Sequence, residues 1–409
     1  MAQKKQFPAG FFWGAATASY QVEGGIENTD WAKAAREGRV PVCDRACDHY
    51  NRYEEDFDIA KALGHNAHRL SIEWARIEPE EGKFDEEAIA HYRKVLDALY
   101  DRGMTPFITL WHFTLPLWFS ESGGFERKDA PEIFARYCAF VVTRFNDRCA
   151  YFSTINEPPV YASNGWLRGS WPPFKRFALT DLISITNSGR TFESKANRGL
   201  RPLFLYLRVM KNLARAHNRA YDEIKKCAPD AEVSIVYHVI LFHANKNPWN
   251  RFKAWIANYF WTYRFMNLVH AKCDSIGLNY YFHKKFGDTA FYPKTDMDWD
   301  IYPEGIEDAL MMLHRYKKPL YVAESGLADA KDVHRAEYIQ EQVRGVWRAM
   351  ERGADVKGHM YWSLLDNYEW ALGFEKRFGL VEINYETLKR TVRPSAHVYE
   401  QICRANEVE

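Results

Sequence analysis

Short runs of β-branched and aromatic residues alternate along the chain with longer segments whose apolar residues recur every three or four positions. This alternation is typical of strand and helix units arranged around a parallel sheet. Two helical segments, residues 92–103 and 337–353, are especially regular, and each ends on a glycine, as helices commonly do. The pattern predicts eight strands, at residues 11–17, 66–72, 105–110, 151–156, 233–238, 275–281, 319–325 and 356–364.

Eight strands with helices between them predict an α/β fold, a single (β/α)8 TIM barrel that forms one domain over residues 1–409. The alternative, an open doubly wound sheet, would carry a glycine-rich phosphate-binding turn after its first strand. Residues 14–25, GAATASYQVEGG, do not have the G-x-G-x-x-G spacing, which favours the barrel. Two segments are less regular. We expect a long surface loop at 174–200, and at 242–268 either a helix on the barrel wall or a rim of the cleft.

Composition adds limits on partners and location. Lys and Arg number 55 against 54 Asp and Glu, so we expect neither a nucleic-acid nor a membrane partner. The N-terminus has no hydrophobic region of useful length, no apolar run could span a bilayer, and the seven cysteines are scattered, which together predict a cytoplasmic protein with reduced thiols. The 14 tryptophans fit a large core and a sugar-binding cleft equally well.

A metal site is the first functional hypothesis to weigh. Cys43 and Cys47 lie close in the sequence to Asp44, Asp48 and His49. Their spacing matches no standard zinc pattern, and no second cysteine pair could complete the ligand set. We therefore expect no metal.

Polar side chains gather where the predicted strands end. Catalytic groups of TIM barrels lie at the C-terminal ends of the strands. The polar and aromatic residues at these ends are His68, Arg69, Glu73, Trp111, His112, Asn156, Glu157, Asn279, Tyr280, Tyr281, Glu324, Ser325, Tyr361 and Trp362. A carboxylate at the end of an apolar strand is costly unless it is paired or hydrated. Glu157 and Glu324, on the fourth and seventh strands, would face each other across the mouth of the barrel.

Two facing carboxylates are what glycoside hydrolysis requires. One protonates the leaving oxygen, and the other either attacks the anomeric carbon or activates water. A separation of about 5–5.5 Å gives retention of configuration and a wider one gives inversion. The sequence leaves that separation open. The alternative is that Glu157 and Glu324 are structural and are each held by a salt bridge.

Several segments in order along the chain resemble glycoside hydrolase family one, the β-glucosidase and β-galactosidase family, with a likeness to its archaeal-type members. The similarity covers essentially the whole chain. The matching segments are FFWGAATASYQVEGG, HRLSIEWARIEP, WHFTLPLW, TINEP, YVAESG, WSLLDNYEW and KRFGL.

The resemblance implies a retaining exo-β-glycosidase acting on β-glucosides, β-galactosides or β-fucosides or on oligosaccharides, without cofactor. Glu157 would be the acid/base, and Glu324 the nucleophile that forms a covalent glycosyl-enzyme. Arg69 and Tyr281 would hold Glu324 ionised and oriented. The residues implied to bind or support the sugar are Gln21, His112, Asn156, Asn279, Tyr281, Trp362, Glu369 and Trp370. Without the resemblance, a structural role is an alternative for His112, Asn279 and Trp362, and for His112 it is the favoured one.

The chain also departs from the family pattern. Ser325 follows Glu324 where the family usually has Asn, so local hydrogen bonding should differ. The chain is short for the family, and we place the shortening near 174–200 and 282–303, where the aglycone would lie. Glu369 argues against the 6-phospho branch, and Glu157 against the thioglucosidase branch. A transglycosylase that uses the same intermediate and a non-catalytic sugar-binding barrel remain the alternatives.

Overall fold

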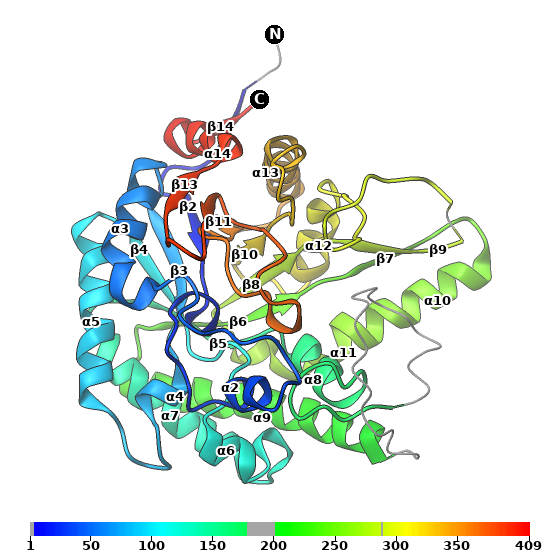
Figure 1. The fold of residues 1–409 in the computed structure, drawn as a ribbon. Helices are drawn as coiled ribbons and strands as arrows, with labels where there is room; N and C mark the ends of the chain where they lie inside the picture. The colour runs from blue at the N-terminus through cyan, green and yellow to red at the C-terminus, as the bar shows by residue number, and fades with distance from the viewer. Residues whose placement is uncertain (1–3, 178–200, 288) are drawn as a thin grey trace.

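Eight parallel strands close into a barrel in a computed structural model of the protein, which describes residues 4–177, 201–287 and 289–409. The strands follow one another around the barrel in chain order, and the last pairs with the first (Figure 1). They are the eight strands predicted from the sequence and differ only at their ends. Their bounds are β2 Phe12–Ala16, β3 Ala67–Ser71, β4 Thr105–Thr109, β5 Tyr151–Asn156, β6 Glu232–His238, β8 Ser275–Tyr280, β10 Leu320–Ser325 and β11 Val356–Trp362.

A helix follows each barrel strand and packs around the outside, which confirms the predicted (β/α)8 fold (Figure 1). The two most regular helical segments are the second and seventh of these helices. Beyond their ends, Gly103 and Gly353 have φ of 66° and 94°, a left-handed backbone that glycine adopts without strain. The eight helices are α3 His49–Ala62, α5 Glu86–Asp101, α7 Ala130–Phe145, α9 Arg201–Cys227, α11 Arg264–Val269, α12 Gly305–His314, α13 Arg335–Glu351 and α14 Pro394–Ala405.

The barrel interior is divided into an apolar end and a polar end. Near the start of the strands, the rings of Phe12, Phe107, Tyr151 and Tyr321 pack together, and the centroids of Phe107 and Tyr151 are 4.4 Å apart. These four rings form an aromatic plug at the N-terminal end of the barrel. Polar side chains occupy the other end, where the buried guanidinium of Arg69 lies. The barrel can therefore present polar groups at its mouth without losing its core.

The elements other than the barrel strands and their eight helices are mostly shorter. The termini meet through the paired strands β1 and β14, beside α14 (Figure 1). No helix among the described residues is long and apolar enough to cross a membrane. The shorter elements are β1 Lys5–Gln6, α1 Ser19–Val22, α2 Asp30–Arg36, α4 Trp74–Ile77, α6 Leu117–Glu121, η1 Gly124–Glu126, α8 Pro158–Trp166, β7 Leu241–Ala244, α10 Pro248–Asn258, η3 Tyr259–Tyr263, η4 His270–Lys272, β9 His283–Phe286, η5 Trp370–Leu372, β12 Val381–Ile383, β13 Arg390–Val392 and β14 Glu407–Val408.

The two irregular segments have different outcomes. Most of the loop expected at 174–200 lies outside the described residues. The segment 242–268 is largely helical and includes α10, the π-helix η3 and most of α11. It also contributes Trp261 to the pocket described below, so both interpretations of this segment hold in part. In Figure 1, α10 extends away from the barrel beside the paired strands β7 and β9.

Candidate active site

A pocket opens at the C-terminal end of the barrel, where the polar strand ends meet. Nine of the predicted site residues line this pocket: Gln21, His112, Asn156, Glu157, Tyr281, Glu324, Trp362, Glu369 and Trp370. The other two predicted residues, Arg69 and Asn279, are buried just behind the lining and contact it through hydrogen bonds. The structure thus brings together residues from α1, from five barrel strands and from loops that follow barrel strands.

Glu324 is held from two sides inside the pocket. The Nη1 atom of Arg69 donates a charged hydrogen bond to its Oε1 atom, and the phenol of Tyr281 donates to Oε2 at 2.6 Å. The rest of the guanidinium is also bound, because Nε donates to Thr109 and Nη2 donates to the Asn156 side-chain oxygen at 2.8 Å. Both groups on Glu324 stabilise a negative charge and fix the direction of the carboxylate.

Glu157 lies in a different environment. It follows β5 with a left-handed backbone, φ 46°, and Pro158 directly begins α8. Such backbone costs about 1–3 kcal/mol for a residue with a side chain. The Oε1 atom of Glu157 accepts a hydrogen bond from the amide of Asn279 at 2.7 Å, so its only close donor is neutral among the residues that the structure describes. The sharp turn at the strand end directs this carboxyl into the pocket.

The two environments separate the carboxyl groups electrostatically. Burial and the nearby charge of Glu324 raise the pKa of Glu157 well above its usual value, against the opposing effect of the Asn279 hydrogen bond. Burial and Glu324 also raise the pKa of Glu369, to about 8. Burial and Arg69 hold the pKa of His112 well below its usual value, which leaves that imidazole neutral. The pocket therefore combines one carboxylate that is paired with a cation and two carboxyl groups whose pKa is raised.

Several buried polar atoms around the pocket have no hydrogen-bond partner among the described residues. They include Oε1 of Gln21, Nδ1 of His112 and both ring nitrogens of His238, all in residues that line the pocket. An unpaired buried polar group costs about 1–3 kcal/mol. Hydroxyl groups donate and accept hydrogen bonds, so a polyhydroxylated ligand suits these atoms. This donor and acceptor set fits a sugar ring and contains no cluster of metal ligands within the described part of the chain.

Aromatic side chains supply the remaining walls. The rings of Trp362 and Trp370 lie nearly parallel to the His112 ring, each with its centroid 6.0 Å away. Five tryptophans line the pocket: Trp171, Trp261, Trp299, Trp362 and Trp370. Others, such as Trp13 and Trp74, are fully buried in the core. Tryptophans therefore lie both in the core and in the pocket, the two positions that composition alone could not distinguish.

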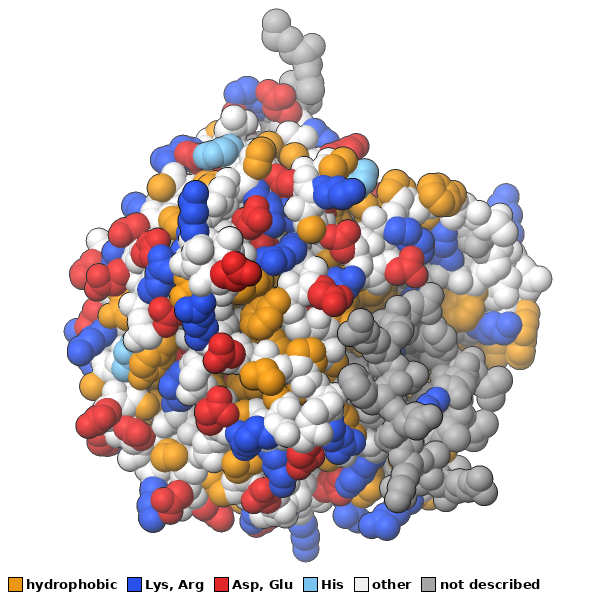
Figure 2. Space-filling model, viewed as in Figure 1, with side chains coloured by type: hydrophobic (Ala, Val, Ile, Leu, Met, Phe, Trp, Pro, Cys, Tyr) orange, Lys and Arg blue, Asp and Glu red, His pale blue; other side chains and the backbone are white. Residues whose placement is uncertain are grey.

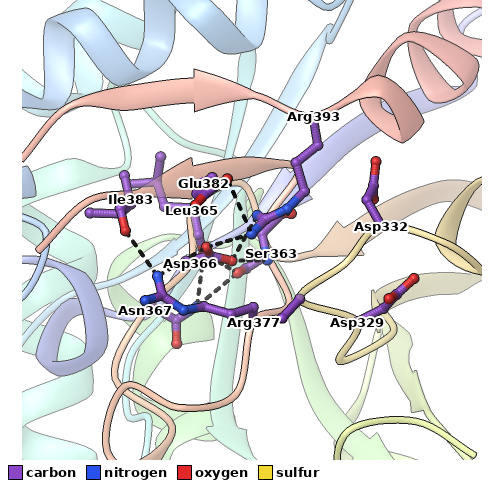
Figure 3. Close-up of polar contacts among 12 residues, drawn as sticks. Asp329, Asp332, Ser363, Leu365, Asp366, Asn367, Arg377, Glu382, Ile383 and Arg393 are labelled. Carbon is purple, nitrogen blue, oxygen red and sulfur yellow. Dashed lines mark hydrogen bonds and ion pairs between the residues drawn. The ribbon is translucent and has the colours of Figure 1, made fainter.

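A buried ion-pair cluster supports the loop between Trp362 and Glu369. The Asp366 carboxylate accepts two hydrogen bonds from Arg393, at 3.0 and 2.9 Å, one from Arg377 at 3.2 Å and one from a backbone amide (Figure 3). Two residues along, the Gln21 amide donates to the backbone oxygen of Tyr368 at 2.8 Å. These contacts fix the loop that presents Glu369 and Trp370 to the pocket.

Sequence reasoning missed part of this wall. His238 ends β6 and lines the pocket, and its position at a predicted strand end could have identified it. Trp171, Trp261 and Trp299 come from irregular segments, where no periodic signal marks them. Phe378 also lines the pocket from the loop that precedes β12.

The structure also shows the positions of Ser325, of Glu73 and of the two neighbouring cysteines. Ser325, where the family usually has Asn, does not line the pocket, and its hydroxyl lies 2.9 Å from Nε2 of His359. Glu73 instead caps α4 and accepts from the hydroxyl of Thr114, away from the pocket. The thiols of Cys43 and Cys47 donate to backbone oxygens, which is a structural role for both.

Comparison with known proteins agrees with this geometry. The sequence profile of glycosyl hydrolase family 1 matches residues 3–251 and 253–408. The chain belongs to this family. This family 1 enzyme is 33% identical to a β-glucosidase A of Thermotoga maritima over 99% of both chains, and 28% identical to a β-galactosidase of Sulfolobus acidocaldarius over 98% of this chain and 96% of that one.

Solved structures show the same relationship. A β-glycosidase from Pyrococcus horikoshii superimposes with a TM-score of 0.88 at 34% identity, over 100% of this chain and 97% of that one. A β-glucosidase from Thermotoga maritima, solved in complex with a methoxycarbonyl-substituted glucoimidazole, gives a TM-score of 0.87 at 31% identity, over 99% and 100% of the two chains. The family 1 enzyme is therefore a retaining β-glycoside hydrolase.

The Asp366 cluster yields a prediction about stability and binding. Asp366→Asn removes the charge that pairs with Arg393 and Arg377, and we expect a loss of about 3–5 kcal/mol in the free energy of unfolding. Because the supported loop carries Glu369, KM for an aryl glycoside should also rise. Urea unfolding and steady-state kinetics measure the two effects.

Glu382→Gln is the matched control. The Glu382 side chain is 57% exposed and lies 3.9 Å from the same Arg393, so its removal should change the free energy of unfolding by no more than about 0.5 kcal/mol. Equal losses in the two variants would contradict the role assigned to the buried pair.

Proposed function

We propose that this family 1 enzyme, acting as one catalytic domain, removes a terminal sugar from β-glucosides, β-galactosides or β-fucosides by double displacement. Glu157 is the acid and then the base, and Glu324 is the nucleophile. The observation that carries the proposal is the contrast between two buried carboxyl groups in one pocket. Glu324 is paired with Arg69, whereas Glu157 has a raised pKa beside the neutral amide of Asn279. The named relatives include a β-glucosidase and a β-galactosidase.

In the first step, a carboxylate oxygen of Glu324 attacks the anomeric carbon, and the bond from that carbon to the leaving oxygen breaks. Glu157 gives its proton to the leaving oxygen, for which a raised pKa is needed near neutral pH. The covalent ester removes the negative charge of Glu324, and the pKa of Glu157 then falls. Glu157 can therefore take a proton from water, which attacks the anomeric carbon and releases the sugar and the Glu324 carboxylate.

The remaining predicted residues bind and orient the sugar. Asn156, whose oxygen is bound by Arg69, presents its amide group toward the 2-hydroxyl, a contact that strengthens in the transition state. Trp362 forms an apolar platform under the ring, and Asn279 supports Glu157. Groups that bind the other hydroxyls are Gln21, His112, Glu369 and Trp370. The two-carboxylate reaction requires no metal and no organic cofactor.

Azide rescue of two variants tests the two roles. Glu324→Gly should show no turnover of 4-nitrophenyl β-glucoside, β-galactoside or β-fucoside, because no nucleophile faces the anomeric carbon. Added azide should fill the space and give an α-glycosyl azide. Glu157→Gly should still form the covalent ester from these good leaving groups, and azide should then give the β-glycosyl azide. Product anomers are identified by NMR.

The two variants control each other, because they remove the same group from opposite sides of the sugar. If Glu324→Gly gave the β-glycosyl azide and Glu157→Gly gave the α-glycosyl azide, the roles of the two residues would be reversed. Turnover of Glu324→Gly at the wild-type rate without azide would remove Glu324 from the mechanism altogether.

Glu369 yields a prediction about the pH dependence of stability. Its folded pKa is about 8 against an ordinary value of 4.5, so at low pH the group is neutral in both the folded and the unfolded states. Between pH 4.5 and about 8, only the unfolded chain ionises, and the wild type loses stability as the pH rises. Glu369→Gln should therefore become progressively more stable than the wild type across this range.

The same variant should lose about tenfold in kcat/KM, because the Gln amide cannot reproduce the hydrogen bonds that the carboxyl group makes with the sugar hydroxyls. Urea unfolding at several pH values and aryl-glycoside kinetics measure the two effects. The exposed Glu382→Gln undergoes the same chemical change and should show neither. A stability difference independent of pH would contradict the burial argument.

We further propose that the enzyme resides in the cytoplasm. All seven cysteines are free thiols, and six of them are buried, which suits a reducing compartment. Fractionation of the source cells with an antibody to the enzyme tests this location. The location would be contradicted if the enzyme were found neither in the cytoplasmic fraction nor in the washes of the membranes that face the cytoplasm.

A further inference from the structure

An exposed row of aromatic side chains runs along α10 and into η3. The exposed fractions are 62% for Trp249, 46% for Phe252, 61% for Trp255, 40% for Tyr259 and 56% for Phe260. Successive rings contact one another, with centroid separations of 5.5, 6.1, 6.2 and 5.4 Å. We call these five residues the aromatic ridge.

The ridge reverses the usual pattern of a surface helix, which turns its large apolar residues toward the protein. Ala254 is the only buried residue of α10, so a small side chain faces inward while the large rings face solvent. Ala254 belongs to the apolar cluster that also contains Trp261 and Phe282 of the pocket wall. A contiguous exposed apolar patch of this kind marks an interaction site.

The segment of the sequence that carries the ridge has charges of one sign. Residues 233–273 contain no Asp or Glu, and the cations in this segment are Lys246, Arg251, Lys253, Arg264 and Lys272. The Lys253 ammonium lies 5.7 Å from the ring centroid of Trp249, and the Arg264 guanidinium lies 5.9 Å from that of Phe260. We expected no membrane partner because the net charge of the whole chain is near zero. That value does not reveal the local excess of positive charge in this segment.

We propose that the aromatic ridge docks the enzyme onto an anionic lipid surface. Tryptophan and tyrosine rings favour the headgroup level of a bilayer, and neighbouring Lys and Arg side chains attract anionic headgroups. In Figure 1, α10 extends away from the barrel, and Figure 2 shows hydrophobic and basic side chains together at that edge of the molecule. A flat surface can therefore reach the ridge. A symmetric contact between two copies would bring the same cations face to face, which is unfavourable.

The ridge adjoins the active-site wall. Within η3, Phe260 faces solvent while the next residue, Trp261, is buried and lines the pocket. The Trp261 indole nitrogen donates to the backbone oxygen of His238 at 3.0 Å. Docking at the ridge thus holds one wall of the pocket beside the lipid surface without involving the catalytic carboxyl groups.

Co-sedimentation with vesicles tests the proposal on the full-length enzyme. The wild type should bind vesicles of phosphatidylcholine and phosphatidylserine, bind pure phosphatidylcholine vesicles much less, and be released by salt. Replacing Trp249, Phe252 and Trp255 together by Ser should abolish binding. The pair Arg251→Glu and Lys253→Glu should weaken binding by at least about fivefold for each cation.

Two matched controls separate the ridge from general surface effects. Tyr100→Ser removes an aromatic side chain that is 69% exposed on α5. The pair Lys211→Glu and Arg215→Glu makes the same charge change on exposed positions of α9. Both controls should bind vesicles as the wild type does. All variants should keep the wild-type melting temperature and aryl-glycoside turnover, because none of the replaced residues lines the pocket.

Other results overturn the proposal. Recovery of the wild type entirely in the supernatant with anionic vesicles would contradict it, as would a loss of binding in the control pair on α9 equal to that of the pair on α10. Light scattering could instead show a dimer that the triple Ser variant converts to a monomer, which would make a second copy the occupant of the ridge.

Discussion

The buried guanidinium of Arg69 organises the polar end of the barrel. It extends from β3 and binds Thr109 at the end of β4, Asn156 at the end of β5 and Glu324 on β10. A buried cation without a partner costs several kcal/mol, so these groups must stay in place for the fold to be stable. Strands that are far apart in the sequence are therefore held by one side chain, and the carboxylate of Glu324 is oriented as part of the same requirement.

Around this cation, carboxyl groups of the same kind lie in different electrostatic environments. Glu324 pairs with Arg69, while Glu157 and Glu369 lie in the same pocket with raised pKa values caused by burial and by the charge of Glu324. Carboxyl groups in this arrangement cost stability, and the rest of the fold must offset that cost. The aromatic plug at the opposite end of the barrel and the Asp366 cluster beside the pocket contribute to this offset.

Aromatic side chains of the same types have three different positions in this enzyme. Phe12 and Phe107 close the bottom of the barrel, Trp362 and Trp370 form pocket walls, and Trp249 and Trp255 face solvent on α10. Trp255 and Trp261 are only six residues apart in the sequence, yet they face solvent and the pocket, respectively. Composition alone cannot separate these positions, because each depends on which neighbours the folded chain brings to that face.

The sequence by itself determined the eight strands, because alternation of apolar runs and helical periodicity is a local property, and it placed Glu157, Glu324 and His112 at strand ends. Tertiary structure decided the contacts between residues that are far apart in the sequence, which no local pattern indicates. The pairing of Asp366 with Arg393 and the contribution of Trp299 to the pocket depend on the path of irregular segments, and the outward direction of the α10 rings depends on how that helix packs. Barrel closure joins distant strand ends, and only then does burial raise the pKa of Glu157 and of Glu369.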